Sequence, residues 1–420
     1  MNINTPSKNQ FNKKIFCWYQ STSDDLLFWC WFDVLILSLN YDLTAEQISI
    51  VFTVSFWIAF FMKFPADVVA KKIGPGRSIM LAAGMFLAAA IFLTFGTSFV
   101  PAIIGQSLYL TGLSFQSMST IIVKNAEQRD PKHVDFISIM SLSETIAAVI
   151  SLVASLLMDL LFGTNSNLPM YICIIFCISS CILAFMVSRY DNTSYDEFNK
   201  WHEMSPVKIL KSLDKSIISG IALLGLFMVI FTVSGNNLKI MITDSLSAIT
   251  TEDNTVFYFS IILLVSRVVK IVSNLFLNYS RKKDIRPKNI IYVIVISVFL
   301  ISVLGILHVW TLGYKAITFA VVAFLIRIVL YDPFRFIVNS YLLQRLDVKK
   351  QTDVLFVQSI GVDLLTAIVS GIATLLLYLE GMNSVMLMLL ALSLVLLVLY
   401  YILRKNFENI DDERRHNTYD

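Results

Sequence analysis

The sequence predicts an all-α membrane protein with twelve transmembrane helices, arranged as two six-helix bundles related by pseudo-symmetry. Three observations support this prediction: the apolar composition, twelve long apolar stretches, and a repeat that relates the two halves of the chain. Hydrophobic residues make up 56% of the 420 residues and charged residues 15%, with a mean hydropathy of +0.72. This is more apolar side chain than a soluble core can bury, so we expect lipid to cover the remainder.

Each apolar stretch is long enough to cross the hydrocarbon core, which takes about 20 helical residues. The stretches cover residues 15–39, 47–70, 78–98, 100–123, 135–162, 168–188, 216–241, 255–279, 289–309, 312–342, 354–379 and 384–403. The first has a basic start but no small-residue cleavage site, so it is predicted to be an uncleaved span. The predicted domains are an amino-terminal bundle (1–188), a central loop (189–215) and a carboxy-terminal bundle with a tail (216–420).

Basic residues are concentrated in alternate connecting segments. They occur at both ends of the chain, in the central loop, and in the segments before the third, fifth, ninth and eleventh stretches, whereas the other segments hold only Lys239 and Lys315. Cytoplasmic loops carry the excess of Lys and Arg in membrane proteins. Both termini and the central loop are therefore predicted to be cytoplasmic in a multi-pass protein of the cell membrane.

Ionisable residues inside the stretches follow a pattern of their own. The third, sixth, ninth and twelfth stretches have none away from their ends, whereas most of the others do. A charged side chain at the centre of a membrane helix costs on the order of 3 kcal/mol, so most of these groups must face one another or water. A charge-free helix at every third position is typical of three-helix repeats whose third member faces lipid.

An internal repeat supports the same division into halves. Residues 149–157 read VISLVASLL and residues 368–376 read IVSGIATLL, an offset of 219 residues. The same offset relates Glu144 to Asp363 and Phe115 to Phe334. A matched acid at the same depth in two apolar helices indicates duplicated halves.

The turn after the second stretch, residues 64–77, resembles the signature loop of the major facilitator superfamily. That pattern runs Pro-x-Gly-x-x-Ala-Asp-Arg/Lys-x-Gly-Arg-Arg/Lys-x. Pro65, Ala70, Lys72 and Gly74 match it, and Arg77 lies in its basic tail.

The loop also departs from the family pattern, because Asp67 stands where the family has glycine and Lys71 where it has aspartate. Asp67 lies four residues before Lys71 and hence on the same helical face. The resemblance implies that Asp67, Lys71, Lys72, Gly74 and Arg77 form a conformational latch, with Asp67 replacing the family aspartate. The alternative is an ordinary basic turn rich in Gly and Pro.

The resemblance further implies two bundles around a central cavity that opens alternately to each side, as in a secondary active transporter of a small solute. The Gly-Pro pattern that drug antiporters of this superfamily carry in the fifth span does not occur in residues 141–162. Polyspecific drug export therefore lacks sequence support.

No catalytic or metal-binding constellation is visible in the sequence. The four histidines, His133, His202, His308 and His416, lie near span ends or in loops, and there is no H-E-x-x-H or Walker-type motif. The five cysteines lie in apolar stretches, where we expect packing rather than disulfides. Neither an enzyme, a cofactor nor a nucleic-acid partner is predicted; the expected partners are a solute, a proton or other coupling ion, and the lipid bilayer.

Candidate cavity residues are the ionisable groups within the apolar stretches. Proton coupling needs a group whose charge can change within the membrane. Glu144 and Asp363 lie about ten residues inside their predicted cytoplasmic ends, roughly 15 Å of helical rise, and are therefore expected near the midplane. Asp25, Trp29 and Asp33 recur at four-residue spacing, which predicts one shared helical face. The alternative role for any one of these acids is a structural ion pair, for example of Asp24 or Asp25 with Lys63 or Arg267.

The second half contributes most of the basic groups. The candidates there are Arg267, Lys270, Arg327, Asp332 and Arg335. An acidic first span facing a basic second half suits a zwitterionic or anionic solute. Asn236 and Asn237 add neutral hydrogen-bonding groups or, alternatively, cap a helix end.

Two other functions remain open from the sequence. An exporter of drugs, amphiphiles or lipids would be favoured by a wide apolar cavity around Trp29, Trp31 and Phe334. A non-transporting membrane sensor or scaffold would be favoured if all the charged groups paired in a closed core.

Overall fold

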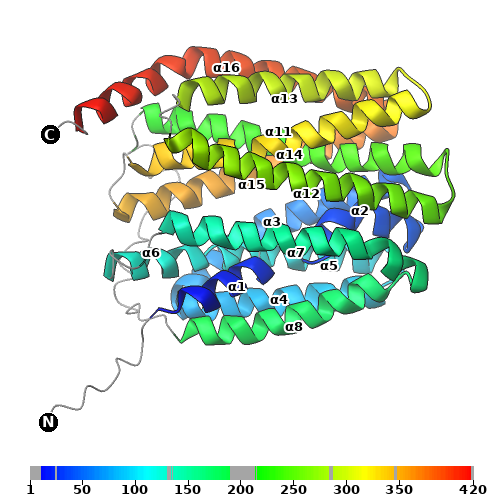
Figure 1. Ribbon diagram of the computed structural model, residues 1–420, viewed down its shortest axis with the longest axis horizontal. Coiled ribbons are helices and arrows are strands. Elements are labelled where there is room, and N and C mark those ends of the chain that lie inside the picture. Colours follow the sequence, from blue (N-terminus) through cyan, green and yellow to red (C-terminus); the bar gives the residue numbers. More distant parts are fainter. Residues whose placement is uncertain are drawn as a thin grey trace, which may run out of the picture. The chain divides into compact units, whose positions relative to one another are not determined.

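The computed structural model describes residues 11–23, 26–129, 134, 136–189, 213, 215–282, 287–344 and 348–417. Every regular element in this part of the chain is a helix (Figure 1). Ten of these helices are long and apolar enough to cross a membrane. The prediction of an all-α, multi-pass membrane protein is therefore confirmed, whereas the count of twelve spans stays a prediction.

The helices differ widely in length, from 11 to 36 residues. In chain order they are α1 (Lys13–Ser23), α2 (Trp29–Leu39), α3 (Ala45–Ile73), α4 (Pro75–Phe95), α5 (Phe99–Gln116), α6 (Ser119–Arg129), α7 (Phe136–Thr164), α8 (Leu168–Ser188), α11 (Lys215–Ser247), α12 (Glu252–Lys282), α13 (Pro287–Val309), α14 (Tyr314–Gln344), α15 (Val348–Glu380) and α16 (Met382–Asn417).

The chain folds into two compact units. The first comprises Met1–Leu43 and Val54–Glu203, and the second comprises Thr44–Thr53 and Met204–Asp420. The start of α3 thus groups with the second unit. Hydroxyl groups attach it to α15, because Ser49 lies 2.7 Å from Thr374, and Thr53 lies 2.7 Å from Ser370 and 2.8 Å from Thr374.

The prediction of one continuous helix over 15–39 is wrong, because α1 ends at Ser23 and α2 begins at Trp29. The residues before the end of α1 are Gln, Ser and Thr, and Ser and Thr hydroxyls compete for helical carbonyls. Ser21, Thr22 and Ser23 all donate to carbonyls one turn earlier in α1. Phe28, just before α2, has a φ of 65°, which a non-glycine residue rarely adopts.

The predicted stretch 100–123 is also interrupted. It contains the end of α5 and the start of α6, with Ser117 and Met118 between them. The Met118 amide donates to the Phe115 carbonyl at 3.2 Å, a tighter turn than an α-helix makes, and the Ser117 hydroxyl donates to the Ser114 carbonyl. The first and fourth predicted spans are thus the discontinuous ones in the first unit.

In the first unit, α1 packs against α7 and α8, and α4 packs against α5 and α8 (Figure 1). The buried core of this unit includes Phe16, Ile79 and Val123. Tyr41, which follows α2, donates its hydroxyl to the Leu93 carbonyl at 2.7 Å. Burial raises the pKa of Tyr41 to about 12, so the hydroxyl stays a neutral donor at physiological pH.

Small residues allow α4 and α5 to pack closely. A Cβ atom at Gly112 would lie 2.7 Å from the Phe86 ring, and one at Gly105 would lie 2.5 Å from the Leu93 side chain. Membrane helices commonly use glycine where their backbones approach each other. The glycines therefore determine the close packing of this helix pair.

Substitution of Gly112 with alanine is expected to lower the thermal stability of the detergent-solubilised protein. Overpacking a tight interface costs roughly 1–3 kcal/mol. The matched control is Gly84→Ala on α4, where a Cβ would meet nothing within 4 Å. We expect the midpoint of thermal unfolding to fall for Gly112→Ala and not for Gly84→Ala. Equal midpoints for the two variants would contradict the packing argument.

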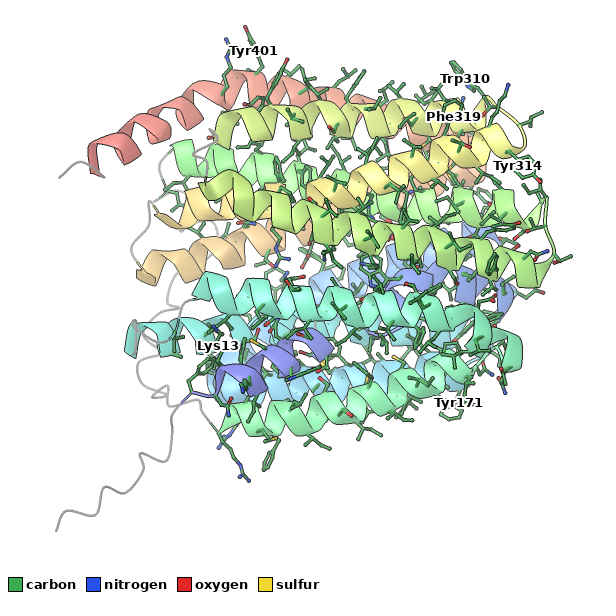
Figure 2. The ribbon with its side chains drawn as sticks, in the orientation of Figure 1. Lys13, Tyr171, Trp310, Tyr314, Phe319 and Tyr401 are labelled. Atoms are coloured by element: carbon green, nitrogen blue, oxygen red, sulfur yellow. The ribbon has the colours of Figure 1, made fainter. Side chains whose placement is uncertain are left out.

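In the second unit, exposed aromatic residues lie at both ends of the bundle. Trp310 and Tyr314 flank the turn between α13 and α14, and Tyr401 lies on α16 towards the other end (Figure 2). Their exposed fractions are 69%, 78% and 61%, respectively. Trp and Tyr are enriched at the two membrane interfaces, so these residues mark the expected boundaries of the lipid-covered band on this unit.

Candidate functional site

The break between α1 and α2 lies beside the carboxyl end of α5, and Gln116 connects them. The Gln116 side-chain carbonyl accepts a hydrogen bond from the Tyr19 hydroxyl. Its amide nitrogen donates to the Ser23 hydroxyl at 2.8 Å and to Gln20 Oε1 at 3.3 Å. All four residues are buried. Gln116 thus holds the last turn of α1 through neutral hydrogen bonds.

Two further side-chain pairs join α2 to α5. The Trp29 indole Nε1 donates to Gln106 Oε1 at 2.6 Å, and the Cys30 thiol lies 3.1 Å from the Tyr109 hydroxyl. Trp29 is fully buried. The first unit therefore places a continuous set of neutral hydrogen-bonding groups beside the interrupted first span.

Of the three acids in the first predicted span, the structure describes Asp33. Asp33 is buried, and one of its carboxylate oxygens accepts a hydrogen bond from the Val34 amide at 2.8 Å. Asp24 and Asp25 lie outside the described residues. Trp29 and Asp33 lie one helical turn apart on α2, which begins after a turn at Leu27 and Phe28. The shared face with Asp25 stays a prediction.

Glu144 lies on α7, which packs against α1. Its side chain is half-buried and has contacts within the fold. The residue before it, Ser143, accepts a hydrogen bond from the Ser21 hydroxyl at its carbonyl, 2.8 Å away. This contact places the Glu144 turn of α7 level with the last two turns of α1.

The predicted latch lies at the turn between α3 and α4. Gly74 has a φ of 83°, which favours glycine, and Pro75 follows as the first residue of α4. The Ser78 hydroxyl donates to the Gly74 carbonyl at 2.8 Å. Asp67 is half-buried, Lys72 and Arg77 are exposed, and the side chain of Lys71 lies outside the described part.

In the second unit, the side chain of Arg327 on α14 crosses to α11. Its Nε donates to the Phe231 carbonyl at 2.8 Å, and its Cζ lies 3.7 Å from the centroid of the Phe231 ring. Only 8% of Arg327 is exposed. A hydrogen bond together with a cation–π contact fixes the plane of the guanidinium.

An aromatic stack continues from this arginine. The Phe231 ring stacks on Tyr331 with centroids 4.3 Å apart, and Phe227 stacks on Phe334 at 3.9 Å. The Arg335 guanidinium lies 5.9 Å from the Tyr331 ring. The two predicted arginines of α14 are therefore brought to the same aromatic surface between α11 and α14.

The remaining predicted residues of the second unit lie on the helices that neighbour α11 and α14. Arg267 on α12 is almost fully buried, and Lys270 on α12 and Asp363 on α15 are half-buried. Each has contacts within the fold. The side chain of Asp332 lies outside the described part of the chain.

Several polar residues of interest were not predicted as site residues. Lys239, which was assigned to an outside segment, is buried within α11, and this helix continues to Ser247. Asn237 is likewise buried inside α11 rather than capping it, and its Nδ2 donates to the Val233 carbonyl. Gln106 and Gln116 are uncharged and carried no signal in a search for ionisable groups.

Comparison with known proteins identifies the relatives of this fold. The family model of the Major Facilitator Superfamily matches residues 25–368. The crystal structure of the nucleoside transporter NupG is similar, with a TM-score of 0.62 and 14% identity over 94% of this chain and 99% of that chain. A POT family transporter in complex with 5-aminolevulinic acid gives a TM-score of 0.65 and 14% identity over 95% and 94%. No curated protein sequence matches significantly.

Proposed function

We propose that this chain, which belongs to the Major Facilitator Superfamily, is a secondary active, proton-coupled transporter. It moves a small polar, zwitterionic or anionic solute across the cell membrane by alternating access. The observation that carries the solute class is the buried Arg327 guanidinium, whose orientation is fixed by Phe231. A buried cation held in one orientation suits recognition of a carboxylate or phosphate.

The proposed architecture has twelve spans, two of which are interrupted. The α1–α2 and α5–α6 pairs each count as one span beside the ten long helices. The bundles then comprise residues 1–188 and 216–420, joined by the central loop 189–215. Discontinuous helices in transporters commonly belong to functional sites, which supports a functional role for the α1–α2 break within the first unit.

The similar solved structures support transport of a small solute in general terms. One is named a nucleoside transporter, and the other is a transporter in complex with 5-aminolevulinic acid. The alternative of a drug or amphiphile exporter gains no support from Trp29 and Phe334, because both rings are fully buried and have partners in their own units.

The experiment that tests this function is reconstitution of the purified protein into liposomes. A panel of amino acids, carboxylates and sugar phosphates would first be screened for thermal stabilisation in detergent, because a ligand that binds the folded state raises its stability. Stabilising compounds would then be assayed as radiolabelled solutes for uptake under an imposed pH gradient. Uptake above that of empty liposomes is expected, and binding without any uptake or exchange would contradict transport.

Both termini and the loop from Asp191 to Lys211 are expected to be cytoplasmic. The loop lies outside the described residues. In intact cells, a membrane-impermeant thiol reagent should label Asn40→Cys and Asn254→Cys but not a cysteine placed at residue 200. The positive-inside bias is the physical reason. Labelling at residue 200 before permeabilisation would overturn the proposed orientation.

Asp67 is expected to control the rate of the conformational cycle rather than solute affinity. Its half-buried carboxylate lies on the last turns of α3, before the Gly74 turn. Asp67→Asn should reduce the transport rate several-fold with little change in the solute Kd, as expected for a group that biases one conformation. The control is Asp42→Asn, an exposed acid outside the helices. An unchanged transport rate at normal expression would contradict the latch role and favour the alternative of an ordinary turn.

A further inference from the structure

The last helix of each predicted half, α8 and α16, buries one stripe of side chains and exposes another. Cys177 and Ala184 belong to the buried stripe of α8, and Leu389 and Leu396 to that of α16. The exposed stripes are apolar and consist of Ile175, Ile178, Ile182 and Phe185 on α8, and Leu394, Val398 and Tyr401 on α16. Both helices correspond to predicted spans without internal charges, so the exposed stripes are expected to face lipid.

Each exposed stripe leads to an arginine that lies over the last aromatic ring of that stripe. The Arg189 Cζ atom lies 4.5 Å from the centroid of the Phe185 ring, and the Arg404 Cζ atom lies 4.1 Å from that of the Tyr401 ring. Both arginines and both rings are exposed. Helical side chains lean towards the preceding turn, and a cation–π contact holds each guanidinium there. Each cation is therefore held against the lipid-facing surface where a span ends.

The two pairs occur at the same place in the two halves of the chain. The first pair ends the sixth predicted span and leads into the central loop, and the second pair ends the twelfth and leads into the tail. Both of these segments are predicted to be cytoplasmic. Anionic phospholipids give the cytoplasmic leaflet its negative surface potential, which attracts basic side chains next to a span. Their charge thus complements that of the two arginines.

The dimensions of the α16 stripe match one leaflet of a bilayer. Leu394 and Arg404 are ten residues apart, about 15 Å of helix, which is roughly half the thickness of the hydrocarbon core. The Tyr401 side chain points outward from α16 (Figure 2). On the neighbouring α13, Tyr292 is 55% exposed, and its ring centroid lies 6.3 Å from that of Tyr400. An acyl chain along this stripe would bring its headgroup level with the arginine.

We infer that the exposed stripes of α8 and α16 each bind an anionic phospholipid, whose phosphate contacts Arg189 or Arg404. The guanidinium stays charged and can donate two parallel hydrogen bonds to a phosphate. Phe185 and Tyr401 act as positioning residues. A zwitterionic phospholipid carries a cationic group beside its phosphate, which repels the guanidinium, so the surfaces favour lipids of net negative charge. This inference goes beyond the proposed function and does not depend on which solute is transported.

The test compares phosphatidylglycerol with phosphatidylcholine of identical acyl chains, each added to the purified full-length protein in detergent. Phosphatidylglycerol should raise the midpoint of thermal unfolding more than phosphatidylcholine, because a ligand of the folded state stabilises it. Arg189→Gln and Arg404→Gln should each reduce this difference, and the double variant should abolish it. Native mass spectrometry should count two fewer bound phosphatidylglycerol molecules on the double variant than on the wild type.

Matched variants separate the two surfaces from general effects of charge. Lys14→Gln and Lys315→Gln each remove an exposed cation, one from each unit, and should keep the wild-type lipid count. Phe185→Leu and Tyr401→Leu keep an apolar side chain but remove the ring, and should weaken the apparent Kd for phosphatidylglycerol at least threefold. All of these side chains except Phe185 and Tyr401 are charged and solvent-facing, so folding in detergent alone should be unaffected.

Three results would overturn the inference. The first is equal stabilisation of the wild-type protein by the two lipids. The second is a wild-type count of bound phosphatidylglycerol on the double variant, or an equal loss on Lys14→Gln and Arg404→Gln. The third is equal stabilisation by glycerol 3-phosphate, which has the phosphate but no acyl chain, because the arginines would then bind a free phosphate. The lipid count is independent of the unfolding midpoint, so it decides the question even if a variant is less stable.

Discussion

Replacing Glu144 or Asp363 with the corresponding amide is expected to abolish proton-driven accumulation of the solute while leaving solute exchange intact. The two acids are equivalent under the 219-residue offset, and both are half-buried on spans about ten residues from the predicted cytoplasmic ends. An acid kept at that depth needs a partner or water to offset its insertion cost. The amide keeps the shape and one acceptor oxygen but cannot change its charge.

The measurement compares pH-driven uptake with counterflow in liposomes loaded with unlabelled solute. Controls on the same two helices are Asp159→Asn on α7 and Glu380→Gln on α15, which should keep wild-type accumulation. A structural ion pair predicts the opposite pattern: lower folded yield and a lower unfolding midpoint, with near-normal transport per folded molecule. That result at both positions would transfer the coupling role to Asp33 and Asp25 in the first span.

Gln116→Leu is expected to cause the largest loss of stability among substitutions of neutral residues in the first unit. It removes the acceptor of the Tyr19 hydroxyl and the donor shared by Ser23 and Gln20, all of which are buried. Each intramolecular hydrogen bond contributes about 1 kcal/mol, so the loss of these three is expected to cost on the order of 3 kcal/mol. This loss of stability would be measured as a fall in the midpoint of thermal unfolding in detergent.

The control for Gln116 is its neighbour Ser117, which is exposed and bonds only within its own turn among the described contacts. Ser117→Ala should leave the midpoint within error of wild type. Gln116→Glu is a second control, because it keeps an acceptor for Tyr19 but loses the donor. A wild-type midpoint for Gln116→Leu would show that the end of α1 does not depend on this side chain.

The sequence predicted the membrane class and the family well because both follow from features that extend over many residues. Composition and the long apolar stretches predicted the all-α membrane fold, and the degenerate loop at 64–77 pointed to the superfamily that the family match confirms. The non-helical residues 26–28 and 117–118 were missed. A stretch of 20 residues has nearly the same hydropathy whether or not one turn of it is helical.

The candidate site was predicted less completely. Arg327 is buried, and one of its contacts is a hydrogen bond to a backbone carbonyl on α11. The sequence does not reveal backbone partners, because they depend on how helices pack. The burial of Lys239 on α11 was likewise not predicted. The second unit surrounds α11 and buries residues 237–243 on every side, so this helix continues without the apolar periodicity that reveals an exposed face.

The interrupted first span has a consequence for how the chain enters the membrane. α1 and α2 each contain 11 residues, about 16 Å of helix, or half the thickness of the hydrocarbon core. Neither half is long enough to be retained in a bilayer by hydrophobicity alone. The groups that satisfy the end of α1 and the start of α2 come from α5, more than 70 residues later in the chain. The first span is therefore expected to insert stably only after the fourth span has emerged from the ribosome. The order of stable insertion then differs from the order of synthesis.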